Sequence, residues 1–173
     1  MWKAKLRDPS LLVERAYVNG QWIEADDGAT IAVTNPADGS EIARVPALQA
    51  AETQRAIKAA HSRFVNWREV PAAERARLLE AWHRLILDNQ EDLALIMTAE
   101  QGKPLSESRG EIAYGASFVK WFAEEARRIY GDTIPSPTAD RRILVIKQPV
   151  GVVAAITPWN FPNAMITRKC APA

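Results

Sequence analysis

The chain has 173 residues, of which 47% are hydrophobic, and a formal net charge of +1 at pH 7. A chain of this length and apolar share is long enough for one globular core of ordinary domain size. Because acidic and basic residues are interspersed, the sequence lacks the broad basic field that nucleic acids need and the polybasic cluster that binds a membrane surface, and we expect neither partner.

Membrane, targeting and metal signals are also missing from the sequence. No apolar run approaches the roughly 20 residues of a membrane helix, and residues 1–7 are not followed by the apolar core of a signal peptide. The cytoplasm is therefore the expected compartment. The single cysteine, Cys170, excludes an internal disulfide, and His61 and His83 stand at no recognised metal-ligand spacing from it. We expect no metal site.

The first part of the chain predicts two β segments. Asn19-Gly20 suits the positive φ values of a tight turn, so residues 16–18 and 21–23 are expected to form a hairpin. A second β region is predicted over residues 31–45, broken by turn signals at 35–36 and 38–39.

Four helices are predicted next, each from an apolar stripe at helical spacing. The stripes are Ile57, Ala60 and Phe64; Leu78, Trp82, Leu85 and Ile86; Leu93, Ile96 and Met97; and Tyr114, Phe118, Trp121 and Phe122. The second helix opens near Pro71, and Gly102 ends the third. The fourth is expected from about residue 105 to residue 130, where Gly131 ends it. Aromatic stripes of this kind more often belong to a core than to a cofactor site.

The last part of the chain predicts strand, loop and helix in that order. Residues 141–148 alternate enough for a strand with a polar side, and residues 151–157 are an apolar, β-branched run typical of a buried strand in a parallel sheet. Ligands bind at the carboxyl ends of such strands, and Pro162 then opens a helix. Asn160 lies in the loop between them. Its amide could stabilise an oxyanion, but on local sequence alone a turn or capping asparagine is about as common.

Residues 156–162, with the sequence ITPWNFP, resemble the signature of the NAD(P)-dependent aldehyde dehydrogenase superfamily. Further resemblances lie upstream in the same order, at residues 18–22, 35–36, 100–104 and 131–135. Together they cover nearly the whole chain. Within the superfamily, residues 121–126, 146–151 and 164–169 look most like succinate-semialdehyde dehydrogenase, with glutarate-semialdehyde dehydrogenase close beside it.

The resemblance implies an α/β fold that is the N-terminal part of the aldehyde dehydrogenase fold: a β-hairpin, a helical layer, an oligomerisation arm and the first strand of a Rossmann-like sheet. Residues 1–135 would be the N-terminal part of the cofactor-binding domain, 136–150 the arm, and 151–173 the start of the dinucleotide-binding sheet with the oxyanion loop. The nucleophilic cysteine, the general-base glutamate and the glycine-rich cofactor turn would lie in later segments. We therefore expect the chain to be inactive alone, and the full-length protein to be a homodimer or tetramer.

The resemblance also assigns roles to site residues. Asn160 would be the oxyanion donor, and Lys169 would lie near the nicotinamide and the proton path. The cofactor, NAD or NADP, would contact the backbone of Ile156, Thr157, Pro158 and Trp159. The substrate would contact Arg168, Phe161, Ala164, Tyr114 and Phe118.

Within this set, Arg168 would pair with the remote carboxylate of a semialdehyde. Phe161, Ala164 and Arg168 share one helical face at i, i+3 and i+7. Without the resemblance, Arg168 would be a surface arginine and Lys169 a solvated charge. Cys170 is not the expected nucleophile, because ten residues of helix would place it roughly 15 Å from Asn160.

The predicted function is NAD(P)-dependent oxidation of succinate semialdehyde to succinate. Two alternatives stay open: a glutarate-semialdehyde or other aldehyde dehydrogenase, and a non-catalytic truncated subunit that acts in binding or assembly.

Overall fold

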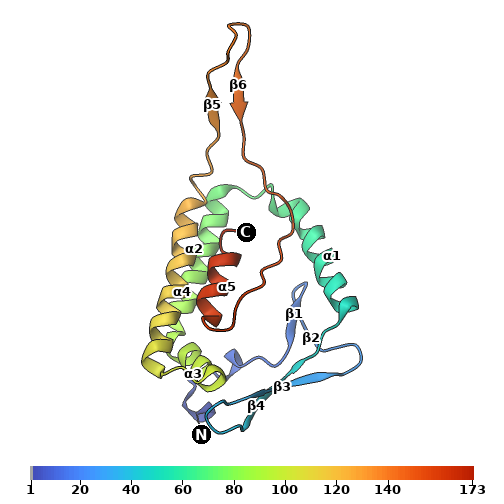
Figure 1. Cartoon of the computed structure of the whole chain (residues 1–173), viewed down its shortest axis with the longest axis vertical. Helices are drawn as coiled ribbons and strands as arrows, with labels where there is room; N and C mark the ends of the chain where they lie inside the picture. The colour runs from blue at the N-terminus through green and yellow to red at the C-terminus, as the bar shows by residue number, and fades with distance from the viewer. Residues whose placement is uncertain (1) are drawn as a thin grey trace.

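A computed structural model describes residues 2–173 of the chain. In these residues five α-helices and three antiparallel strand pairs follow two short 3-10 turns (Figure 1). The elements are the turns Lys3–Lys5 and Pro9–Leu11, β1 Ala16–Val18, β2 Gln21–Ile23, β3 Thr30–Thr34, β4 Glu41–Pro46, α1 Ala50–Trp67, α2 Ala72–Asp88, α3 Gln90–Gln101, α4 Leu105–Glu125, β5 Asp132–Ile134, β6 Ile143–Val145 and α5 Pro162–Cys170.

Both predicted β segments near the N-terminus are present. β1 pairs with β2 across a turn in which Asn19 and Gly20 have φ values of 50° and 83°, as a tight hairpin requires. β3 pairs with β4 in antiparallel register, with an irregularity between Val33 and Thr34. The turn signals at Asn35 and Asp38 therefore lie in the connection between these two paired strands.

The main core lies where α2, α3, α4 and α5 pack together. Its buried side chains are Ile86, Ala94, Met97, Ile112, Ala116, Val119 and Ala171. Helices α2, α4 and α5 lie side by side on one flank of the molecule, and α3 lies at their lower end in this view (Figure 1). This bundle places the last helix, α5, directly against α4.

Helix α1 stands apart from this bundle (Figure 1). Its predicted apolar stripe is only partly covered, because Ile57 is 53% exposed and Ala60 is also exposed, whereas Phe64 is half-buried. On α2, Ile86 is buried but Leu85 is 60% exposed. The helical periodicity was thus a correct guide to helices and a weaker guide to which apolar positions are covered.

Helix α4 ends earlier than its sequence indicates. The helix stops at Glu125, not at Tyr130, because the backbone N–H of Arg128 donates to the carbonyl of Glu125 (2.8 Å), three residues back. This tighter turn replaces the α-helical bond four residues back. The chain then enters β5, which pairs with β6 in a hairpin that projects away from the helices (Figure 1). The predicted strand over 141–148 is therefore reduced to Ile143–Val145.

The predicted buried parallel strand over residues 151–157 is not formed. The segment is without assigned secondary structure, with Val152 42%, Val153 53% and Ile156 93% exposed. A strand needs hydrogen-bonded neighbours, and within residues 2–173 no strand pairs with this segment. The apolar residues of this segment suggested a buried strand, but they carry no information on whether another strand lies beside it.

None of the helices in residues 2–173 is long and apolar enough to cross a membrane.

Candidate active site

The start of α5 is contacted by residues from α4 and from the connection between α3 and α4. Pro162 is the first residue of α5, as the sequence predicts, and Phe161 is its N-cap position. The Phe161 side chain cannot accept a hydrogen bond, so the free N–H groups of the first turn need a partner from elsewhere.

Glu111 supplies that partner from α4. Its Oε1 accepts hydrogen bonds from the backbone N–H groups of Asn163 (2.9 Å) and Ala164 (3.3 Å). Glu111 is 4% exposed, and its Oε2 accepts a hydrogen bond from Nζ of Lys103. A carboxylate at a helix N-terminus is favoured by the helix dipole, and a buried carboxylate also needs a cation beside it. Glu111 satisfies both conditions.

Gln101 and Lys103 hold the loop that precedes α5. Gln101 Nε2 donates to the carbonyl oxygens of Trp159 (3.1 Å) and Asn160 (2.9 Å). Lys103 Nζ donates to the carbonyl oxygen of Asn160 (3.1 Å) and lies 4.2 Å from the ring centroid of Phe161. Gly102, between the two donors, ends α3 in the left-handed region (φ 76°), which turns the chain sharply after Gln101.

Gly115 allows α5 to lie close to α4. A Cβ atom built at this position would stand 1.9 Å from Oδ1 and 3.0 Å from Cγ of Asn163, and 3.2 Å from Oγ1 of Thr167. Only glycine leaves room for these side chains. The short distance between the helices is what lets Glu111, one turn earlier on α4, reach the first turn of α5.

Arg168 is fixed against two aromatic residues of α4. Its Nη2 donates to the hydroxyl oxygen of Tyr114 (2.8 Å), and its Cζ lies 4.5 Å from the ring centroid of Phe118 and 5.6 Å from that of Tyr114. The two rings are themselves in edge contact, 4.7 Å apart. Within residues 2–173 no carboxylate lies within ion-pair distance of Arg168, and its buried Nε has no hydrogen-bond partner. The guanidinium is therefore held in place by neutral groups.

The other predicted site residues differ in how far they are exposed to solvent. Ala164 has no exposed surface and lies in the α4–α5 contact, so here it contributes space rather than a contact surface. Phe161 is 41% exposed beside Lys103. Asn160 and Lys169 are exposed at opposite ends of α5.

The predicted cofactor segment, residues 156–159, is accessible. Ile156 is 93% and Trp159 80% exposed, and Pro158 is also exposed, whereas Thr157 is half-buried. Most of this segment is therefore open to solvent. This segment and the exposed Asn160 precede α5, and Arg168 lies in the last turn of that helix.

Sequence reasoning assigned no function to Gln101, Lys103 or Glu111. Gln101 and Lys103 were recognised only as part of the resemblance at residues 100–104. Glu111 carried one usable signal: it stands one helical turn before Gly115, and a glycine inside a helix often marks a close helix contact. An acid next to such a contact is a candidate for capping the incoming helix.

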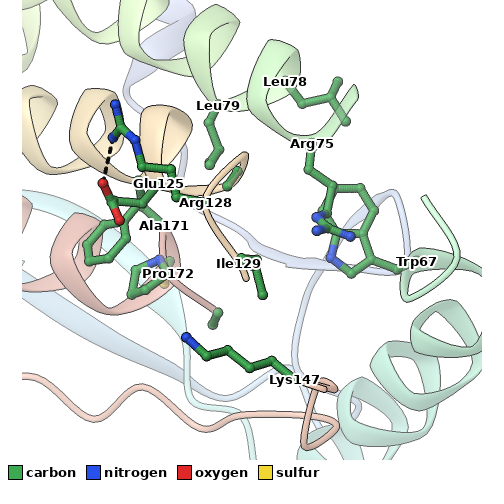
Figure 2. A pocket seen from close by; sticks show the side chains of 14 residues that line it. Trp67, Arg75, Leu78, Leu79, Glu125, Arg128, Ile129, Lys147, Ala171 and Pro172 are labelled. Atoms are coloured by element: carbon green, nitrogen blue, oxygen red, sulfur yellow. Dashed lines mark hydrogen bonds and ion pairs between the residues drawn. The ribbon is translucent and has the colours of Figure 1, made fainter. Parts of the chain in front are cut away.

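A separate pocket of about 350 Å³ lies at the other end of α5 (Figure 2). Leu78, Leu79 and Ile129 contribute apolar surface, Lys147 points into it, and Cys170 is part of its wall. None of the predicted catalytic, cofactor-binding or substrate-binding residues lines it. We place the candidate site at the start of α5 and not in the pocket, because Gln101, Lys103 and Glu111 hold the backbone on both sides of the exposed Asn160 there.

Comparison with known proteins gives a consistent result. The model of the aldehyde dehydrogenase family matches residues 22–173. A 3-sulfolactaldehyde dehydrogenase of Pseudomonas putida is 62% identical over 169 residues, and the succinate-semialdehyde dehydrogenase [NADP(+)] of Escherichia coli (strain K12) is 56% identical. Each match covers 98% of this chain and 35% of the relative. A crystal structure of an aldehyde dehydrogenase from Brucella melitensis biovar abortus 2308, 60% identical, superposes with a TM-score of 0.95 over 96% of this chain and 35% of the other.

Proposed function

Because this chain belongs to the aldehyde dehydrogenase family, we propose that its site serves the NAD(P)-dependent oxidation of an aldehyde with a remote anionic group, succinate semialdehyde being the first candidate. The chain spans about a third of the length of the relatives that it matches. The proposal therefore concerns the full-length protein that carries this sequence. Both relatives are named for aldehydes that bear an acid group, a sulfonate or a carboxylate.

The position of Arg168 is the observation that supports an anionic substrate. The Arg168 guanidinium is held by one hydroxyl and two aromatic rings, so none of these contacts supplies the negative charge that an anionic substrate would bring. The guanidinium N–H groups that Tyr114 does not engage can donate to the carboxylate oxygens of a substrate. Tyr114 and Phe118 then form apolar walls beside the aliphatic part of a short substrate.

Asn160 is assigned the oxyanion role. Its backbone carbonyl is held by Gln101 and Lys103, while its side chain is exposed and can donate N–H to an oxygen that gains charge as the aldehyde carbon becomes tetrahedral. NAD or NADP, when bound, supplies the acceptor for the hydride. The backbone of residues 156–159 would hold it, and Lys169 would stand near the proton path. Cys170 has no part in this assignment.

The remaining assignments concern assembly. We propose that residues 136–150, the predicted oligomerisation arm, contribute to a homo-oligomer through the hairpin in which their strand β6 pairs with β5, which lies just before residue 136. We also propose that the boundaries at residues 135 and 150 separate this arm from the cofactor-binding parts. The projection of this hairpin away from the helices supports the proposal (Figure 1). Glutarate semialdehyde is the alternative substrate, since it carries the same terminal carboxylate on a longer stem.

Arg168→Leu in the full-length protein tests the substrate class. The variant keeps an apolar stem and removes the charge, so the ratio of kcat/KM for succinate semialdehyde to that for an uncharged aldehyde of similar length should fall. Truncating one partner of a buried charge pair costs roughly 2 kcal/mol or more, which is about a 30-fold change in this ratio. Steady-state cofactor reduction at 340 nm provides both values.

The matched control is Arg77→Leu, which removes an exposed arginine on α2 that pairs only with its neighbour Glu74. It should leave the ratio unchanged. A ratio unchanged in Arg168→Leu would mean that Arg168 does not read the anion, and the function would then be reduced to aldehyde oxidation without a defined substrate class.

A further inference from the structure

Gln101, Lys103 and Glu111 together fix the backbone on both sides of Asn160. The two donors bind the carbonyl oxygens of Trp159 and Asn160, and the carboxylate binds the N–H groups of Asn163 and Ala164. No other side chain in residues 2–173 donates to those two carbonyls. The backbone is therefore held by hydrogen bonds at residues 159–160 and at residues 163–164, while the Asn160 side chain is exposed.

Lys103 links the two anchors. Its ammonium donates to Oε2 of Glu111 and to the carbonyl of Asn160, and it lies over the ring of Phe161. The side chain of Lys103 is 12% exposed and that of Glu111 1% exposed, so the pair is shielded from solvent and depends on this one geometry. Moving the Lys103 ammonium would disturb the loop and the helix cap together.

The geometry points to Gln101, Lys103 and Glu111 as positioning residues that aim the Asn160 side chain. Gln101 lies at the end of α3, Lys103 in the connection to α4 and Glu111 on α4, and we assign none of them a contact with a reacting atom. The inference rests on the proposed role of Asn160, and it adds three residues that act through it. A shift of about 1 Å in a catalytic group can cost on the order of 10²-fold in rate, so contacts that fix its backbone can be as important as the group itself.

Gln101→Met is the sharpest variant, because it removes both hydrogen bonds to the loop without leaving a buried charge. In the full-length protein it should lower kcat by about 10- to 100-fold with little change in KM. In an Asn160→Ala background the same change should lower kcat by less than about threefold, since the group that it aims is gone. A merely structural role for Gln101 would give the same loss in both backgrounds.

Gln90→Met is the matched control. Gln90 stands at the other end of α3, and its Nε2 also donates to a backbone carbonyl, that of Arg109 (2.9 Å). This variant loses a glutamine-to-carbonyl bond on the same helix without touching the loop, so its kcat should equal that of the parent.

Lys103→Met tests the linked anchors in the same two backgrounds. It leaves the Glu111 carboxylate without a cation, so the double variant Lys103→Met/Glu111→Gln, which removes both charges, is measured beside it. If Lys103→Met fails to fold, the double variant provides the same comparison. An equal loss of kcat with and without Asn160 overturns the inference.

Amide hydrogen exchange provides a readout that does not depend on activity. In the 173-residue chain, a peptide that covers residues 157–167 should exchange at least tenfold faster in Gln101→Met and Lys103→Met than in the parent or in Gln90→Met. Unchanged exchange in both variants overturns the positioning role. A full-length parent that reduces no cofactor with any aldehyde instead refutes the proposed function, and with it the use of this anchor in catalysis, while the exchange result still reports whether the anchor exists.

Discussion

The backbone carbonyl and the side chain of Asn160 have different surroundings. Its carbonyl oxygen accepts hydrogen bonds from Gln101 and Lys103, and its side chain is exposed with no hydrogen-bond partner in residues 2–173. A turn or capping asparagine would use its side chain to bind nearby backbone groups. The free amide therefore favours the oxyanion role over the structural one.

Asn160→Ala in the full-length protein should therefore lower kcat by about 10² to 10³-fold, the usual effect of removing one oxyanion donor. KM should change less, because the donor acts mainly on the charge of the transition state. Initial rates over a range of semialdehyde concentrations separate the two values. A folded variant with the kcat of the parent would return Asn160 to the role of a turn residue.

At this scale the sequence could suggest candidate residues but not the side chains that hold them. Asn160 and Arg168 stay predictions, and they could be made because residue type and position in a family-like segment carry information. Gln101 and Glu111 were not predicted, because their function depends on which carbonyls and amides of a distant segment lie within reach, 58 and 52 residues away along the chain. Such contacts are set by how the helices pack, which cannot be read from local patterns in a single sequence.

Among the elements, the contact between α4 and α5 decides the geometry of the site. Two glycines on α4 have opposite surroundings: a Cβ atom at Gly115 would collide with Asn163, whereas a Cβ atom at Gly110 would meet nothing within 4 Å. Replacing each glycine by alanine therefore distinguishes two effects. Alanine is favoured over glycine in a helix at both positions, but only at Gly115 does it also crowd the neighbouring helix.

Gly115→Ala should destabilise the chain, because overpacking of a close contact costs about 1–3 kcal/mol and exceeds the roughly 0.5–1 kcal/mol that alanine contributes in a helix. Gly110→Ala should be neutral or stabilising by up to about 1 kcal/mol. Urea unfolding of parent and variants measures both. If the two variants are equally stable, Asn163 moves aside at no cost and the contact between α4 and α5 is not tight.

The sequence was a good guide to elements whose signals are local. The Asn19-Gly20 hairpin, the glycine end of α3 and the proline start of α5 depend on φ preferences of one or two residues, and all three are present. The buried strand over 151–157 and the last turn of α4 were wrong. A buried strand depends on neighbouring strands, and the end of α4 depends on one backbone bond of Arg128 that no residue type signals.

In the molecule as a whole, two buried carboxylates fasten loops to helices. Asp92, in the first turn of α3, accepts hydrogen bonds from the backbone N–H groups of Arg7 (3.0 Å) and Asp8 (2.8 Å). Glu52, in the first turn of α1, accepts them from Asp26 (3.0 Å) and Gln49 (3.0 Å). In both cases backbone donors favour the ionised form, so the pKa of each carboxyl lies below its ordinary value.

These pKa shifts predict the direction of acid sensitivity. Because the pKa of Asp92 is lower in the folded chain than in the unfolded one, where it is about 3.9, the unfolded state binds protons first as the pH falls. The stabilising contribution is essentially complete above about pH 5 and is lost as the pH falls through the unfolded and then the folded pKa. Asp92→Asn should therefore lower the urea midpoint at pH 7 and reduce its fall between about pH 5 and pH 2.

The exposed residue Asp88, at the end of α2, provides the control, since Asp88→Asn removes a carboxylate that caps no loop. Its midpoint should follow that of the parent across the same pH range. A parallel curve for Asp92→Asn, lowered equally at every pH, would assign the loss to packing and not to the charge.

Gln101 and Lys103 hold the loop of Trp159 and Asn160 through contacts within the chain. The conformational entropy of ordering this loop is therefore lost when the chain folds. Under the proposed function, folding free energy and turnover would depend on the same few contacts. Local opening of the α3–α4–α5 junction would release the loop well before global unfolding, so loss of activity on heating would precede loss of helical structure.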